Sequence, residues 1–207
     1  VSGNGSFLFW MRPNNVGPAL VLTPLQECPP GMDPSLFRAG SLEYLDEEGV
    51  YVHSAAAGAG ARELGGNWRL PHSSVVLAPA GKPGSEAATG FKFRWAEGYD
   101  GIRDLLVEER LFDIQVVPGM TLPVDLDALV AVRTDAAVES VAAEFPGLSR
   151  IESLGTKGGR RIYKVRFSKL GENMLTLKAA GGRTTYLEFF VTEPLETLVK
   201  KRASFLA

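Results

Sequence analysis

Apolar and polar residues alternate most regularly in the second half of the chain. The alternation predicts strands at residues 121–126, 129–133, 138–144, 150–154, 161–167, 174–178 and 185–192. Pairs of turn residues, at 146–147 and 181–182 for example, separate most of these segments. Seven short strands in about 75 residues are typical of an immunoglobulin-like β-sandwich. The chain has a single cysteine, so the prediction concerns this architecture without the disulfide of antibody domains.

The stretch from residue 89 to 118 joins this region to the first part of the chain. Within it, residues 90–96 alternate between aromatic and basic side chains. Such alternation predicts a half-buried strand of an antiparallel sheet. Its core face is expected to hold Phe91, Phe93 and Trp95, and its solvent face Lys92 and Arg94.

A short helix is predicted directly after that strand. Asp100 is expected to be its N-cap. Ile102, Leu105 and Leu106 recur at the spacing of one apolar helix face. An extended segment is expected at 113–117. The stretch is therefore predicted to close one sandwich, turn through the helix and begin the next.

The first part of the chain carries fewer strand signals and longer loops. Strands are expected at 7–12, 18–25 and 73–78, a hairpin from 42–45 and 49–54, a helical turn within 55–66, and loops at 26–40 and 81–89. The chain is thus predicted to be mainly β. A β-sandwich (supersandwich-like) domain with long loops is expected at 1–116 and the immunoglobulin-like β-sandwich at 117–192.

The last segment, 193–207, is predicted to be helical. Pro194 suits the first turn of a helix. Six residues then fall on one helical stripe, which is mostly apolar: Leu195, Leu198, Val199, Arg202, Phe205 and Leu206. We interpret this segment as the start of a linker helix that leads to another domain.

Charge and rare residue types exclude several classes of partner. The formal net charge of -2 and the isoelectric point near 5.8 argue against nucleic acid and anionic membranes. Cys28 is the only cysteine, and His53 and His72 are the only histidines. No metal site and no cofactor are therefore expected. No apolar run has membrane-spanning length, and the N-terminus lacks a signal-peptide pattern.

Acidic residues are the first kind of candidate chemistry. Paired carboxylates would suit a glycosidase, and acids are frequent between residues 43 and 109. Most of them are expected in turns or on a solvated helix face. No catalytic residue is assigned on this pattern.

Aromatic platforms for sugar are the second kind. An indole ring stacks its face against the apolar C–H face of a sugar while polar neighbours bond the hydroxyls. Trp68 lies in a loop with Asn67, Arg69 and His72. This loop is the preferred candidate for carbohydrate binding. The alternative is a tryptophan that anchors a long loop to the sandwich.

Trp10 and Arg12 form a further candidate for carbohydrate binding. They lie close together on the first predicted strand, where Trp10 is expected to be partly exposed. Trp95, by contrast, is interpreted as core, because it shares its face with two phenylalanines. A metal or acid-base role for either histidine is less favoured than a surface or hydrogen-bonded histidine.

Long phrases of this chain resemble a known family. The phrases are WAEGYDGIRDLLVEERLFDIQVVPGMTLPVDL, RIESLGTKGG, YKVRFSKLGENMLTL and YLEFFVTEPLETLVKKRASFLA. They resemble the non-catalytic β-rich region of large bacterial and fungal proteins of unknown function that are described as similar to six-hairpin glycosidases. The resemblance implies a following helical toroid, a glycosidase-like parent protein and an extracellular or periplasmic location. It transfers no catalytic residue.

Three functions stay open at this point. The leading one is an accessory, structural β-sandwich module of a carbohydrate-active enzyme that contacts polysaccharide or oligosaccharide. The second is a self-contained hydrolase or lyase acting on polysaccharide. The third is an adhesion or protein-interaction module. The resemblance implies that an enzyme of that design would not be active as this chain alone.

Overall fold

The chain divides into two units of tertiary structure, unit 1 and unit 2. The structure, a computed structural model, describes residues 6–47, 50–64 and 72–206. Unit 1 comprises residues 1–113 together with 183–185, and unit 2 comprises 114–182 together with 186–207. Strands predominate over helices, and the predicted class, mainly β with a sandwich architecture, is confirmed. The domain boundaries at 116 and 192 stay predictions.

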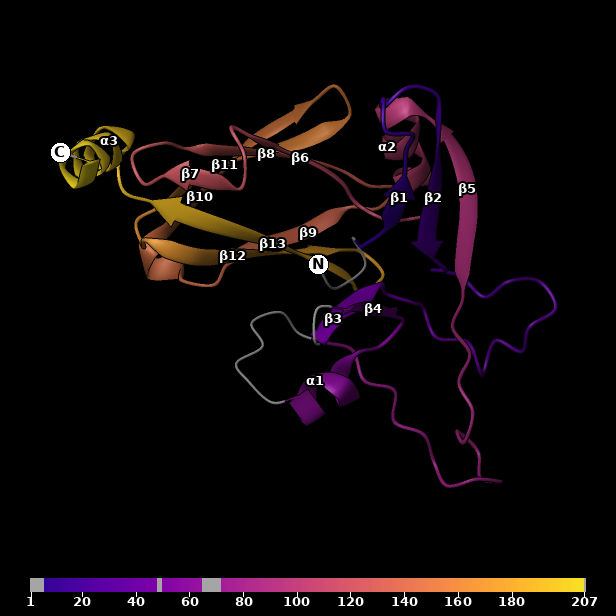
Figure 1. The fold of residues 1–207 in the computed structure, drawn as a ribbon. Helices are drawn as coiled ribbons and strands as arrows, with labels where there is room; N and C mark the ends of the chain where they lie inside the picture. Colours follow the sequence, from indigo (N-terminus) through magenta and orange to yellow (C-terminus); the bar gives the residue numbers. More distant parts are fainter. Residues whose placement is uncertain (1–5, 48–49, 65–71, 207) are drawn as a thin grey trace. The chain divides into compact units, whose positions relative to one another are not determined.

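A three-stranded antiparallel sheet forms the centre of unit 1 (Figure 1). Its central strand is β2 (Pro18–Pro24), which pairs with β1 (Leu8–Trp10) on one side and with β5 (Phe91–Glu97) on the other. These three strands match the sequence predictions. Residues directly opposite one another share a face of the sheet. Leu20 therefore lies between Trp10 and Trp95 on one face.

Helix α2 (Gly98–Glu108) packs on the other face of this sheet. Its buried residues Ile102 and Leu105 contact a cluster of small sheet residues: Ala19, Val21 and Ala96. Small side chains at these positions allow the helix to approach the strands closely. The helix begins at Gly98, so the prediction of Asp100 as N-cap is wrong; Asp100 lies in the first turn and forms an ion pair with Arg103.

The predicted core face of β5 is also wrong. Phe93 and Trp95 are 61% and 69% exposed, and Phe91 is exposed as well. The face that was expected to be solvated holds Ala96 against α2, and it also holds Lys92 and Arg94, which bind carboxylates next to the end of that helix. Strand alternation identified two distinct faces. It did not identify which face the helix covers.

The remaining elements of unit 1 are a hairpin and a short helix. The predicted hairpin is confirmed as β3 (Glu43–Glu47) paired with β4 (Val50–Ser54). Helix α1 (Gly58–Leu64) follows, within the segment predicted to be helical. The strand predicted at 73–78 is wrong. This segment is not a strand, and Val76 is 90% exposed, so its apolar residues do not reflect burial.

Unit 2 is a sandwich of two four-stranded sheets, with strand orders β10-β11-β8-β6 and β7-β13-β12-β9 (Figure 1). The strands are β6 (Asp113–Val117), β7 (Thr121–Pro123), β8 (Ala128–Arg133), β9 (Val138–Ala143), β10 (Ser149–Lys157), β11 (Arg160–Phe167), β12 (Gly171–Ala179) and β13 (Arg183–Thr192). A short 3-10 helix, η1 (Pro146–Leu148), precedes β10. All seven strands predicted from residue 121 onward are present.

The core of unit 2 lies between its two sheets. Inward positions alternate with outward positions along β11, β12 and β13. Phe167 from one sheet and Phe189 from the other are almost fully buried, and their ring centroids lie 5.0 Å apart. Here the alternation predicts the buried face correctly, because each sheet covers the apolar face of the other.

Two features lie at the ends of the sandwich. The chain passes from one sheet to the other between β6 and β7, at a cis peptide bond before Pro118. The predicted terminal helix is present as α3 (Leu195–Leu206), and none of its residues is buried. Among the described helices, none is long and apolar enough to cross a membrane.

Candidate functional site

The open face of the unit 1 sheet gathers exposed aromatic side chains. We call it the aromatic face, and it consists of Trp10, Phe91, Phe93 and Trp95, with Leu20 and Leu22 from the central strand between them. The cross-strand register places all six on the same side of the sheet. Trp10 is 49% exposed. The face is therefore an apolar, ring-lined surface.

Two of these rings are nearly parallel. The centroids of Trp10 and Phe93 lie 6.3 Å apart, with an angle of 29° between the ring planes. The rings come from the two outer strands, β1 and β5. Such a surface can stack on flat apolar groups, and each indole adds one N–H donor for a polar partner.

The predicted binding residues fall in three places. Trp10 lies on the aromatic face and is partly exposed, and Arg12 follows β1 as an exposed residue. Asn67, Trp68 and Arg69 lie outside the described residues. His72 is largely buried beside Glu43. Carbohydrate binding by these six residues stays a prediction.

Glu43 is the centre of a buried polar cluster. Its carboxylate accepts hydrogen bonds from the Ser41 hydroxyl (2.8 Å) and from the backbone N–H groups of Ala57 (2.8 Å) and Ser73 (2.9 Å). His72 Nδ1 lies 3.5 Å from Glu43 Oε2. We call these residues the Glu43 cluster. It connects β3, the start of α1 and the segment that follows residues 65–71.

Glu43 is held in its ionised form. Burial alone would raise the pKa of this carboxyl, but hydrogen bonds from Ser73, Ala57 and Ser41 outweigh burial and lower the pKa below its ordinary value. A carboxylate with a lowered pKa is a poor proton donor near neutral pH. The arrangement therefore suits a structural connection better than a general acid.

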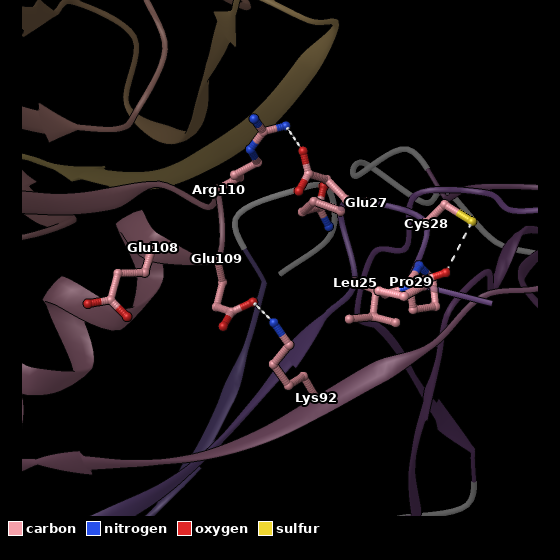
Figure 2. A pocket seen from close by; sticks show the side chains of 10 residues that line it. Leu25, Glu27, Cys28, Pro29, Lys92, Glu108, Glu109 and Arg110 are labelled. Atoms are coloured by element: carbon pink, nitrogen blue, oxygen red, sulfur yellow. Dashed lines mark hydrogen bonds and ion pairs between the residues drawn. The ribbon is translucent and has the colours of Figure 1, made fainter. Parts of the chain in front are cut away.

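A pocket of about 260 Å³ lies between the loop after β2 and the end of α2 (Figure 2). Figure 2 shows Lys92 pointing toward Glu109, with 2.7 Å between Lys92 Nζ and Glu109 Oε2. Arg110 forms an ion pair with Glu27 across the pocket. The Cys28 thiol makes weak contacts with two carbonyl oxygens, those of Pro29 at 3.7 Å and Met32 at 3.6 Å. Most of the charged side chains that line the pocket therefore bind one another.

The two adjacent carboxylates of this pocket do not form an acid and base pair. Glu109 is nearly buried and also receives a hydrogen bond of 2.9 Å from Arg94, whereas Glu108 is more than half exposed. Burial would raise the pKa of Glu109, but bonds from Lys92 and Arg94 outweigh burial and lower it. Glu109 is thus an ionised partner that fastens the end of α2 to β5.

Metal binding has no support within the described part of the chain. Among these residues, no three His, Cys, Asp or Glu side chains form a group that could hold an ion. The side chain of His53 lies outside that part.

Sequence reasoning missed the exposure of Phe93 and Trp95 and the burial of Glu43 and Glu109. One signal was available for the sheet. Ala19 and Ala96 alternate with the large residues, and small residues mark the place where a helix can approach. For the two glutamates there was no local signal, because most of their partners are distant in the sequence.

Comparisons with known proteins agree with this architecture. The fold defines the chain as a two-unit protein rich in β-sheet. A model of a family of unknown function, DUF5695, matches residues 5–207, and the chain belongs to that family. No curated protein matches the chain. The predicted relation to six-hairpin glycosidases stays a prediction.

One solved structure similar to this chain is described as a polysaccharide lyase. The two share 15% sequence identity, with a TM-score of 0.60. The match covers 99% of this chain but only 27% of the lyase chain. At this identity the likeness shows the fold alone. The fold of this chain therefore occurs as about a quarter of a longer protein.

Proposed function

We propose that the chain is an accessory β-sandwich module of a carbohydrate-active protein, and that it contacts polysaccharide through the aromatic face. The observation that carries the proposal is the exposure of Trp10, Phe93 and Trp95 on one side of a single sheet. Large aromatic groups in that number seldom gather on a surface without a partner. The ring faces can stack on sugar rings, and the indole N–H groups can donate hydrogen bonds to sugar hydroxyls.

The spacing of the two tryptophans supports this contact. Trp10 and Trp95 occupy the outer strands in register with Leu20 of the central strand. Two strand spacings amount to about 10 Å. A chain of linked sugar rings can therefore lie across the sheet with a ring on each tryptophan. The loop at 67–69, His72 and Arg12 remain the proposed polar contacts.

A catalytic role for this chain alone is not part of the proposal. The buried carboxylates of unit 1, Glu43 and Glu109, are ionised and already bonded by neighbouring groups. Neither is placed to donate a proton to a leaving group. We propose that chemistry belongs to another part of a glycosidase-like or lyase-like protein, located outside the cytoplasm.

A second partner is proposed for α3. Its exposed apolar residues are Leu195, Leu198, Val199, Phe205 and Leu206. An apolar helix face of this kind is typically covered by another helix. The similar lyase chain is much longer than this one. We therefore propose that α3 docks against a helical domain of the same protein.

Affinity electrophoresis tests the polysaccharide contact. The chain is run in native gels that contain neutral polysaccharides, such as dextran, xylan or glucomannan, beside a gel without polysaccharide. We expect retardation in at least one of these gels. The double variant Trp10→Ala, Trp95→Ala should migrate as it does in the empty gel. The matched control is Phe190→Ala, which removes an exposed aromatic ring from unit 2.

Two results would overturn the proposal. Unretarded migration of the parent chain in every gel would refute the proposed polysaccharide contact. Retardation of the double variant would show that polysaccharide binds somewhere other than the aromatic face. A third measurement tests the accessory role: release of reducing ends or of unsaturated sugars by the purified chain would show that the chain itself is an enzyme.

A further inference from the structure

A charged groove of about 430 Å³ lies on unit 2. Six polar residues line it: Asp127, Arg150, Glu152, Lys164, Arg166 and Ser168. Those on β10 and β11 belong to the outer face, because the alternate residues Val165 and Phe167 are buried in the sandwich core. The groove therefore opens on the side of this sheet that faces away from the core.

The basic side chains of the groove differ in their contacts with carboxylates. Asp127 forms ion pairs with both Arg166 and Lys164, the latter at 3.2 Å. Among the described residues, the only ion-pair partner of Arg150 is Glu152, with 3.9 Å between Nη2 and Oε2. Asp125 also acts electrostatically on Arg166, so Arg150 is the cation of the groove with the weakest carboxylate contact.

Arg150 and Arg166 are directly opposite each other on neighbouring strands. Like charges at directly opposed positions of an antiparallel pair reduce the stability of the sheet. Asp127 offsets the charge of Arg166, but Arg150 is 82% exposed and its guanidinium makes no close bond. Its planar fork of N–H donors suits a carboxylate or sulfate group.

We infer that this groove binds an anionic substituent, carboxylate or sulfate, of an acidic polysaccharide. Arg150 supplies the main bidentate contact, and Lys164 and Ser168, which also line the groove, supply further donors. The anion relieves the repulsion between the opposed arginines. The inference rests on the proposed polysaccharide contact and adds the class of sugar, which the aromatic face alone does not select.

The test measures dissociation constants for three polymers: dextran, dextran sulfate and polygalacturonate. Dextran and dextran sulfate differ in the sulfate group, and polygalacturonate supplies the carboxylate arm. We expect at least one anionic polymer to bind more tightly than dextran. Raising the salt concentration should weaken that binding, because salt screens exposed charges.

Variants locate the site. Arg150→Gln should weaken anionic binding about 3-fold to 10-fold, in line with about 1 kcal/mol for one exposed charged contact. Arg150→Glu should abolish the preference for the anionic polymer. The matched control is Lys178→Gln, which removes one positive charge from an exposed position on the other sheet. Circular dichroism confirms that each variant is folded.

The outcomes separate the two proposals. Equal binding of dextran and both anionic polymers would overturn the groove, and so would an unchanged preference in Arg150→Glu. If the Trp10 and Trp95 double variant no longer binds dextran but still prefers the anionic polymer, the chain has two distinct binding surfaces. If the parent chain binds only anionic polymers and the double variant binds them equally well, the proposed contact through the aromatic face is overturned and the proposed groove is supported.

Discussion

The two units use alternating strands in opposite ways. In unit 2 the large apolar residues point into the sandwich, where Phe167 and Phe189 meet between the sheets. In the unit 1 sheet the aromatic residues Trp10, Phe91, Phe93 and Trp95 point outward, and Ala19, Val21 and Ala96 face the helix. The alternation of residues along the strands is equally clear in the sequences of both units. The difference lies in what covers each face.

This comparison separates side-chain size from burial. Size predicts the inner face when two apolar sheets pack against each other, because both faces need bulk to fill the space between them. A helix that packs close to a sheet needs small side chains beneath it. Unit 1 is then left with aromatic residues that its own core does not require. Those residues are available for binding.

The largest expected effect lies in the sandwich core. Phe167→Ala should lower the free energy of unfolding by about 4 kcal/mol, because it removes a buried ring and leaves a cavity. Urea denaturation followed by far-ultraviolet circular dichroism measures the change. The matched variant is Phe93→Ala on the aromatic face. A similar cost for both variants would contradict the contrast between the units.

The next effect concerns the Glu43 cluster. Glu43→Ala should cost about 3 kcal/mol, because it leaves the buried N–H group of Ala57 and the partly buried N–H group of Ser73 without their acceptor. Glu63→Ala, at an exposed position of α1, serves as the control. Because the pKa of Glu43 is lowered in the folded protein, its stabilising effect is complete above the ordinary value of 4.5 and is lost as the pH falls below it.

A pH series therefore tests the same residue in a second way. The difference in unfolding free energy between parent and Glu43→Ala should be largest near neutral pH and should shrink in acid. A difference that stays constant from about pH 7 to about pH 3 would show that the charge of Glu43 does not contribute.

Overpacking tests the covered face of the unit 1 sheet. Ala19→Leu should destabilise the protein by about 2 kcal/mol, because Ala19 is fully buried under α2 and leaves no room for a larger side chain. The same change at the exposed Ala142 of β9 should have little effect. Urea denaturation distinguishes the two. A neutral Ala19→Leu would mean that α2 does not pack tightly.

The smallest effect on stability is expected on the aromatic face. Trp95→Ala should change the unfolding free energy by less than about 0.5 kcal/mol, as is usual at exposed positions. Its effect should appear in polysaccharide binding instead. A loss of several kcal/mol on denaturation would show that these rings belong to a core, as the sequence alone suggested.

Much of the fold could be predicted from local patterns. The strands of unit 2 follow alternation and turn residues, and both are properties of neighbouring positions. The positions of Glu43 and Glu109 could not be predicted this way. Each depends on partners many residues away, such as Ser73 for Glu43 and Lys92 for Glu109. The strand wrongly expected at 73–78 shows the same limit, since apolar composition alone does not provide a pairing partner.

The position of the tryptophans has a practical consequence. All three, Trp10, Trp68 and Trp95, belong to the residues of unit 1. Light absorbed by indole therefore gives emission from that unit alone, and two of the three emitters lie exposed on the surface where we propose that sugar stacks. A bound sugar would shield them from water and from soluble quenchers. Tryptophan fluorescence should therefore report binding at the aromatic face of unit 1 and should not report binding at the charged groove of unit 2.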